Sequence, residues 1–338
     1  MSDGMYATAR ELVAADKGIL AADESTGTIK KRFEAIGLES TEEHRRRYRQ
    51  MLFTTPGIGD HISGVILFDE TIRQSTDDGV SFVQLLESGG MIPGIKVDTG
   101  AKPLALFPNE TVTEGLDGLR ERLAEYRGLG ARFAKWRATV IIGDGTPTDG
   151  AILANAHAMA RYAALCQEAE IVPIVEPEIL MDGDHGIEAC EDATARTLDE
   201  LFAQLRIMRV DFAGTLLKVN MIVPGKGSTN QVSDAEIAAA TVRVLAAHVP
   251  AEVPGVVFLS GGMSDEQATS RLNEMNRIGG FPWELSFSYG RALQAPSLAA
   301  WGGRPENVEA GQLALAHRAR MNGLARTGAY SPDMESAA

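Results

Sequence analysis

Eight short apolar segments, each followed by a longer amphipathic stretch, most limit what this chain of 338 residues can fold into. Each segment has the length and the glycine or polar boundaries of a buried β-strand. The stretches between them show helical spacing, and one of them, residues 233–249, begins with a capping box of Ser233 and Glu236. The predicted strands are residues 17–23, 62–69, 92–98, 133–142, 171–180, 214–223, 255–262 and 283–291.

Strand–helix alternation repeated eight times predicts an α/β fold in which a parallel sheet closes on itself, the (β/α)8 or TIM barrel. A doubly wound open sheet is the competing architecture. It is disfavoured because no G-x-G-x-x-G follows the first predicted strand. We see no linker or break in composition, so we expect a single domain over residues 1–338. The small, polar residues from about 325 onward predict a short, loose C-terminal tail.

The charge and the cysteines exclude several classes of protein. A net charge of -14 with a pI near 5.0 argues against nucleic-acid binding, which needs a basic face. Cys166 and Cys190 form no C-x-x-C pair, so we expect reduced thiols and no metal bound by cysteine. The N-terminus lacks the apolar core of a signal peptide, and no apolar run is long enough to cross a bilayer. We therefore expect a soluble, cytoplasmic protein with no nucleic-acid or membrane partner.

Polar residues lie in or directly after seven of the eight predicted strands. In a barrel enzyme the catalytic groups stand at the carboxyl ends of the strands, and polar side chains inside apolar strands are costly unless they satisfy one another. Arg137 could instead be a solvated charge at a strand end, and Glu178 a residue of the rim. The residues in question are Asp23, Lys96, Lys135, Arg137, Glu176, Glu178, Lys218, Ser260, Ser288 and Arg291.

Lys218 is the most informative of these residues because apolar residues flank it along its strand. A buried lysine is paired or functional, and a structural ion pair with Glu176 is one explanation. The other is a Schiff-base lysine, since burial and a nearby cation such as Lys135 favour the neutral amine, which can attack a ketone. The protonated imine would stabilise a carbanion on the next carbon, so carbon–carbon cleavage would need carboxylates but no metal or other cofactor.

Two loops at the ends of the last strands are candidates for phosphate binding. Gly261 and Gly262 follow the seventh strand, where exposed backbone N–H groups could hold an anion. Gly290 and Arg291 end the eighth strand. The loops after strands seven and eight are the recurrent phosphate site of these barrels, although a plain turn is the commoner meaning of "SGG" alone.

Together these segments resemble class I fructose-bisphosphate aldolase, the metal-independent family that uses a Schiff base. The resemblance runs in the family's order from about residue 5 to about residue 331. It is carried by GILAADESTGTIKKR (18–32), GIKVD (94–98), FAKWR (133–137), VEPEIL (175–180), LLKVN (216–220), FLSGG (258–262) and FSYGRALQ (287–294).

The resemblance implies a role for each matched residue. Lys218 would form the imine, Glu176 would act as acid and base, and Asp23, Lys135 and Glu178 would surround the imine. One phosphate would be held by the residues of the last two strands, Ser260, Gly261, Gly262, Ser288, Gly290 and Arg291. Lys96 would contact the substrate near Lys135, and the other end of the sugar would be held by Lys31, Arg32 and Arg137.

The reaction implied is reversible cleavage of fructose 1,6-bisphosphate to dihydroxyacetone phosphate and glyceraldehyde 3-phosphate, as in glycolysis and gluconeogenesis, by a homotetramer. Animal members of the family end in a tyrosine on a long tail that assists proton exchange. This sequence has Tyr330 but no terminal tyrosine, so we expect another group to take that role.

Three alternatives stay open from the sequence. One is a Schiff-base aldolase for a different sugar phosphate, and another is a non-enzymatic binding protein. The third is a metal-dependent aldolase, which would need a cluster of histidine ligands. The six histidines are widely spread, and only His61 and His185 lie near strand ends; the others are His44, His157, His248 and His317.

Overall fold

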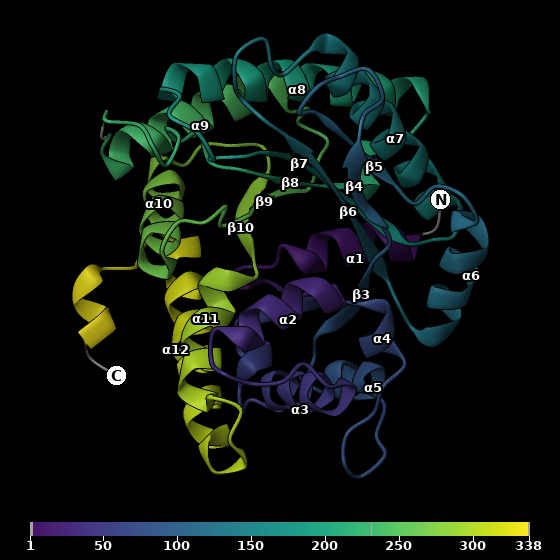
Figure 1. Cartoon of the computed structure of the whole chain (residues 1–338), viewed down its shortest axis with the longest axis vertical. Coiled ribbons are helices and arrows are strands. Elements are labelled where there is room, and N and C mark those ends of the chain that lie inside the picture. Colours follow the sequence, from purple (N-terminus) through teal and green to yellow (C-terminus); the bar gives the residue numbers. More distant parts are fainter. Residues whose placement is uncertain (1–2, 231, 337–338) are drawn as a thin grey trace.

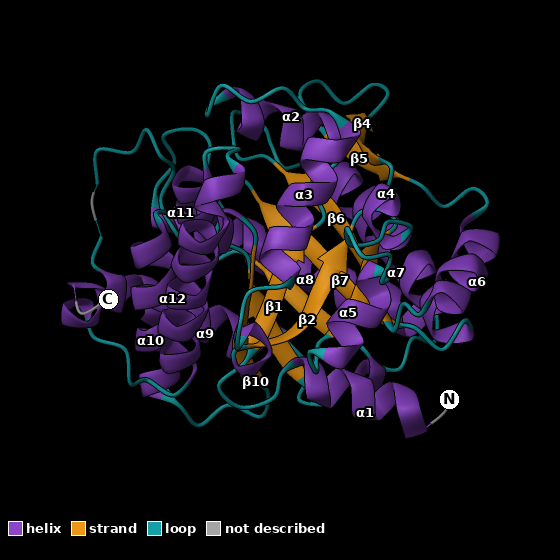
Figure 2. Cartoon of the chain, turned by 90° about the horizontal axis from the view of Figure 1, so that it is seen from below, coloured by secondary structure: helices purple, strands orange, loops and turns teal. Residues whose placement is uncertain are grey.

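Eight parallel strands form a closed barrel in the computed structural model, which describes residues 3–230 and 232–336 (Figures 1 and 2). The predicted (β/α)8 fold is confirmed, with helices on the outside of the strands. The hydrogen-bonded order around the barrel is β1 (Gly18–Ala22), β2 (Ile62–Leu67), β3 (Ile92–Lys96), β6 (Phe133–Val140), β7 (Val172–Ile179), β8 (Leu216–Val219), β9 (Gly255–Phe258) and β10 (Glu284–Tyr289), which pairs with β1.

Helices connect these strands along the chain. The capping box predicted at Ser233 is present at the start of its helix. The helices are α1 (Asp3–Leu12), α2 (Thr26–Glu34), α3 (Glu42–Phe53), α4 (Asp69–Ile72), α5 (Phe82–Ser88), α6 (Leu119–Leu129), α7 (Asp149–Glu168), α8 (Ile187–Ile207), α9 (Asp234–His248), α10 (Asp265–Ile278), α11 (Arg291–Trp301) and α12 (Val308–Arg326). Short 3-10 helices are η1 (Ile58–Asp60), η2 (Phe212–Gly214), η3 (Pro305–Asn307) and η4 (Pro332–Ser336).

The barrel is closed at the amino ends of its strands by apolar side chains. Helix α1 lies across this end (Figure 2) and contributes Met5 and Leu12 to a buried cluster with Phe133 and other inward-facing strand residues. Because this end is filled, the polar residues of the strands can meet only at the opposite, carboxyl end.

Glycines in the strands make room for large rings inside the barrel. A Cβ atom on Gly94 would lie 2.3 Å from Cζ of Phe133, and one on Gly18 would lie 2.5 Å from the ring of Phe287. Both rings are fully buried. Small residues opposite large ones thus fill the interior at normal packing density.

One pair of strands was not predicted. β4 (Gly100–Pro103) and β5 (Thr111–Glu114) form an antiparallel hairpin between β3 and α6. Neither strand has an apolar run, and most of β4 is exposed, so the patterns that identify buried strands do not detect it.

The C-terminal segment from about residue 325, which the sequence predicts to be a loose tail, makes polar contacts with other parts of the chain. Arg326 is buried at the end of α12, where its guanidinium donates hydrogen bonds to the carbonyl oxygens of Val13 (2.8 Å) and Lys17 (3.1 Å). Farther along, Glu335 accepts hydrogen bonds from Arg318 (2.6 Å) and Tyr330 (2.9 Å). These polar residues bind neighbouring elements, which their composition alone does not reveal.

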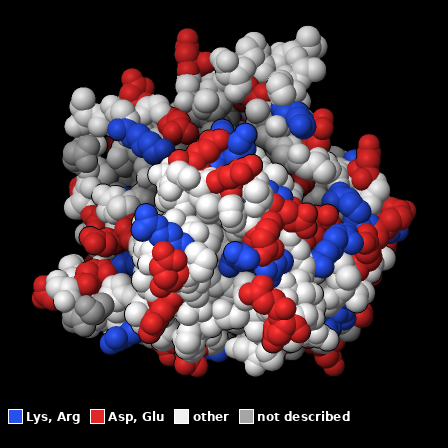
Figure 3. Space-filling model, turned by 60° about the horizontal axis from the view of Figure 1, so that its bottom comes forward, with Lys and Arg blue, Asp and Glu red and all other residues white. Residues whose placement is uncertain are grey.

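The surface carries both signs of charge. On the face shown in Figure 3, Asp and Glu side chains are interspersed with Lys and Arg. Within the described ranges, the helices are all too short or too polar to cross a membrane. Cys166 and Cys190 are buried free thiols on α7 and α8.

The packing of Gly94 gives a stability prediction. We expect Gly94→Ala to lower the free energy of unfolding by about 1–3 kcal/mol, because the new methyl group overlaps the ring of Phe133. Gly128→Ala is the matched control at an exposed position of α6, where a Cβ atom meets nothing within 4 Å, and we expect it to raise stability by about 0.5–1 kcal/mol. Urea unfolding of both variants measures the difference, and equal effects would contradict the packing argument.

Candidate active site

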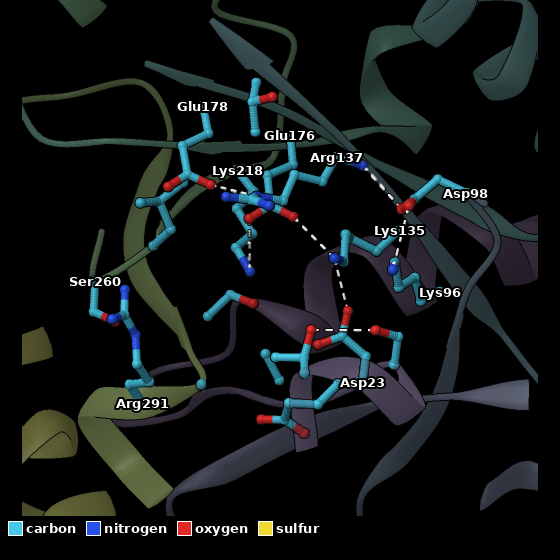
Figure 4. A pocket seen from close by; sticks show the side chains of 18 of the residues that line it. Asp23, Lys96, Asp98, Lys135, Arg137, Glu176, Glu178, Lys218, Ser260 and Arg291 are labelled. Carbon is cyan, nitrogen blue, oxygen red and sulfur yellow. Dashed lines mark hydrogen bonds and ion pairs between the residues drawn. The ribbon is translucent and has the colours of Figure 1, made fainter. Parts of the chain in front are cut away.

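A cavity of about 580 Å³ opens at the carboxyl ends of the barrel strands. Of the fifteen site residues predicted from the sequence, fourteen line it; Gly262 is the exception and lies just behind the lining. Figure 4 shows the charged side chains converging from β3, β6, β7 and β8 and from the end of β1. Residues far apart in the sequence meet here because neighbouring parallel strands end at the same rim.

Four charged side chains of alternating sign form a continuous row in this cavity. Lys135 Nζ lies 2.7 Å from Asp23 Oδ2 and 3.2 Å from Glu176 Oε2. Lys218 Nζ lies 3.1 Å from the other oxygen of Glu176, Oε1. Lys135, Glu176 and Lys218 are buried, and Asp23 is partly exposed. Glu176 therefore bridges two ammonium groups, and its Oε2 has no hydrogen bond of good geometry among the described residues.

The row fixes the charge of its members. Burial alone would raise the pKa of Asp23 and of Glu176, but the nearby lysines outweigh it, so both carboxyl pKa values lie below their usual range. Burial would likewise lower the pKa of Lys135, but Asp23 and Glu176 together raise it above the usual value. Lys135 thus stays charged between two carboxylates, whereas Lys218 pairs with only one of them.

A second pair of ionic contacts lies beside this row. Arg137 binds Glu178, and Lys96 Nζ lies 3.3 Å from Asp98 Oδ1. Arg137 is not a free charge at a strand end, nor is Glu178 an exposed residue of the rim, since Glu178 is buried. Asp98 was not predicted as a site residue. Its place at the end of GIKVD, two residues after β3 ends at Lys96, is the signal that could have identified it.

Helix α2 contributes the wall next to β1. Glu24 is buried and binds the guanidinium groups of Arg32 and Arg49. Its Oε1 also accepts a hydrogen bond of 2.9 Å from Gln294 Nε2. Glu24 holds Arg32 at the edge of the cavity. Glu24 was not among the predicted site residues, although it directly follows Asp23.

The side of the cavity next to β9 and β10 has the features of an anion site. Ser260 and Arg291 both line the cavity on this side (Figure 4). Ser288 is buried, and its Oγ has no hydrogen-bond partner among the described residues. Gly261 and Gly262 have φ values of +53° and +101°, a region that favours glycine. Arg291 is exposed and forms no ion pair within the described ranges.

The structure also shows where Tyr330 lies and whether the described residues include a cluster suited to a metal ion. Tyr330 does not line the cavity; its ring is buried in the hydrophobic core, and its hydroxyl donates a hydrogen bond of 2.9 Å to Glu335. Burial and a hydrogen bond to Glu335 raise the pKa of its hydroxyl. Residues 3–230 and 232–336 contain no group of three or more His, Cys, Asp or Glu arranged to hold a metal ion.

Removal of Lys135 tests the charge row. We expect Lys135→Met to lower the free energy of unfolding at pH 8 by about 3–5 kcal/mol, because it leaves two buried carboxylates short of a partner. The lowered pKa values of Asp23 and Glu176 add stability above the ordinary carboxyl pKa of about 4 and lose it as the pH falls. The deficit of the variant should therefore stay constant from pH 8 to about pH 5 and shrink as the pH falls below about 4.

Denaturant unfolding at several pH values measures this deficit. Lys30→Met is the control, since the Lys30 side chain is largely exposed and its ammonium lies 3.9 Å from Glu34; we expect a change within about 0.5 kcal/mol. A deficit that grows at low pH would show that the carboxylates do not depend on Lys135.

Comparison with known proteins agrees with this geometry. The family model for fructose-bisphosphate aldolase class-I matches residues 4–338. A probable fructose-bisphosphate aldolase class 1 from Xanthomonas campestris is 56% identical over 96% of this chain and 97% of its own length. A cytosolic fructose-bisphosphate aldolase from Arabidopsis thaliana is 52% identical over 98% of this chain and 84% of its own.

A solved structure shares the fold over nearly the whole chain. It is a fructose-bisphosphate aldolase from Plasmodium falciparum, in a complex with TRAP and a small-molecule inhibitor, with a TM-score of 0.96 and 49% identity. The match covers 97% of this chain and 95% of that one. With the barrel, the buried lysine on β8 and these similarities in agreement, this chain belongs to the class I fructose-bisphosphate aldolases.

Proposed function

We propose that this chain reversibly cleaves fructose 1,6-bisphosphate to dihydroxyacetone phosphate and glyceraldehyde 3-phosphate through an imine on Lys218, as a carbon–carbon lyase. The observation that carries the proposal is the contact of Lys218 Nζ with Glu176 Oε1 at 3.1 Å, in a buried cavity where Lys135 already neutralises the other carboxylate oxygen. Family membership over residues 4–338 supports the same reaction.

The proposed steps use only side chains of this cavity. Glu176 first accepts a proton from the ammonium of Lys218, and the resulting neutral amine attacks the ketone carbon. One amine proton passes to the former ketone oxygen, and Glu176 returns its proton to the same oxygen, which leaves as water when the protonated imine forms. Glu176 then accepts the proton of the hydroxyl on the fourth carbon, and the bond between the third and fourth carbons breaks. Its electron pair moves into the protonated imine, which gives an enamine and releases the aldehyde. Protonation of the enamine and hydrolysis free the second product.

The other charged residues support these steps. Asp23 and Lys135 form a charged wall next to Glu176, and the fixed charge of Lys135 stabilises the carboxylate form of Glu176. Glu178 orients Arg137. We assign one phosphate to the residues Ser260, Gly261, Gly262, Ser288, Gly290 and Arg291, and the other end of the sugar to Lys31, Arg32, Lys96 and Arg137.

Borohydride trapping tests the imine. We expect dihydroxyacetone phosphate and borohydride, with excess chelator present, to leave a stable adduct on Lys218, because hydride addition reduces the imine to a secondary amine. Peptide mass mapping locates the adduct. Lys218→Met should give no adduct and lose activity by about a thousandfold or more. An adduct on Lys135 instead, or activity abolished by the chelator, would refute the assignment.

The acid and base role of Glu176 has its own test. We expect Glu176→Gln to lower kcat by about 100- to 10,000-fold, the usual contribution of general acid–base catalysis. Steady-state kinetics with fructose 1,6-bisphosphate measures it, and Glu188→Gln on the exposed first turn of α8 is the control. A loss below about tenfold would exclude Glu176 as the main proton carrier.

Two cation groups in one cavity support a bisphosphate substrate. We expect a higher kcat/KM for fructose 1,6-bisphosphate than for fructose 1-phosphate, and equal values would contradict this preference. We also propose a homotetramer in the cytoplasm; the relative from Arabidopsis thaliana is named cytosolic. Light scattering should give a mass about four times the 36.2 kDa of one chain.

A further inference from the structure

Lys226 is a cation next to the Ser260–Gly262 loop to which neither the sequence motifs nor the cavity lining assigns a role. A Cβ atom on Gly262 would lie 2.9 Å from Lys226 Nζ and 3.4 Å from Nη2 of Arg291. The ammonium and the guanidinium therefore both lie on the same side of this glycine, in the space that a side chain would occupy. Lys226 belongs to the loop between β8 and α9, whereas Arg291 begins α11, so two cations reach this loop from different elements.

The backbone around Lys226 is held in place by the loop that follows β7. Lys226 N donates to the carbonyl oxygen of Met181 (2.8 Å), Gly225 N to that of His185 (2.9 Å) and Gly227 N to that of Gly183 (2.7 Å). A Cβ atom on Gly225 would lie 2.5 Å from the Gly183 oxygen, so this close approach requires glycine. Three consecutive backbone hydrogen bonds therefore fix the backbone position from which the Lys226 side chain extends.

The side chain itself is only weakly held. Its one ion pair among the described residues is with Asp182 Oδ1 at 3.3 Å, and the two side chains are 46% and 65% exposed. Exposed pairs of this kind contribute little. The Lys226 ammonium can therefore exchange Asp182 for a doubly charged phosphate with little loss, because it already lies next to Gly262 and its stem is flexible.

We propose that Lys226 is a substrate-binding residue that contacts the phosphate of the ketone half of the substrate, together with Arg291. This inference rests on the proposed function. The ketone half is the part joined to Lys218, and its phosphate is one carbon away from the imine carbon. β9, which carries the Ser260 loop, is the direct neighbour of β8, with Lys218 opposite Val257. The remaining cations of the cavity lie on β3, β6 and α2.

Trapping of two ketones separates phosphate binding from imine chemistry. The probes are dihydroxyacetone phosphate and dihydroxyacetone, which lacks the phosphate, each titrated with borohydride. We expect Lys226→Met to raise the half-saturating concentration of dihydroxyacetone phosphate about tenfold, the effect of one hydrogen bond to a charged group. The value for dihydroxyacetone should not change. Lys226→Arg should stay within about twofold of the wild type for both, because it keeps the charge, and Lys30→Met should match the wild type.

Each other outcome overturns the inference. If dihydroxyacetone phosphate half-saturates the Lys226→Met variant and the wild type at the same concentration, Lys226 does not contact the phosphate. An equal shift for both ketones would mean that the substitution disturbs Lys218 rather than phosphate binding. If neither ketone labels Lys218 in the wild type, the proposed function itself fails. If the wild type is labelled and the Lys226→Met variant is labelled at the same concentrations, only the role of Lys226 fails.

Discussion

The contact of Lys135 with both Asp23 and Glu176 is the interaction on which the rest of the site depends. Two carboxylates in a buried cavity are costly to ionise unless a cation lies between them. Because Lys135 stays charged, it neutralises one oxygen of Glu176 and leaves the other to contact Lys218. Without this arrangement, the carboxylate of Glu176 would protonate more readily. The roles that we propose for Glu176 and Lys218 thus depend on a neighbour to which we assign no bond to the substrate.

The barrel makes this arrangement possible through an asymmetry between its two ends. At the amino ends of the strands, α1 and rings such as Phe133 fill the interior with apolar side chains. At the carboxyl ends, adjacent strands place charged residues at the same level: Arg137 lies opposite Glu176, and Lys96 opposite Lys135. Apart from Lys96 and Asp98, the ionic partners therefore come from different strands, and these charges are satisfied only when the barrel has closed.

This explains what could and could not be predicted from the sequence. The apolar segments and the polar residues inside them predict the barrel and most of the cavity, because burial at fixed positions along a strand is a local property. The partners of these residues are set by contacts across the barrel, so Asp98 and Glu24, which follow the strands, were missed as site residues. The exposed β4–β5 hairpin lacks an apolar pattern, and the packing of Arg326 depends on carbonyl groups of Val13 and Lys17 more than 300 residues away.

The cavity also resolves how a protein with a net charge of -14 can hold an anionic substrate. Seven basic and five acidic residues line it, so its walls are positive although the chain as a whole is negative. The five carboxylates all have basic partners: Asp23 and Glu176 bind Lys135, while Glu24, Asp98 and Glu178 bind Arg32, Lys96 and Arg137. Lys31 and Arg291 form no ion pair within the described ranges. Positive charge is therefore uncompensated at two places, which are the places to which we assign the two phosphates. In a chain that is otherwise acidic, the positive potential is confined to the mouth of the barrel.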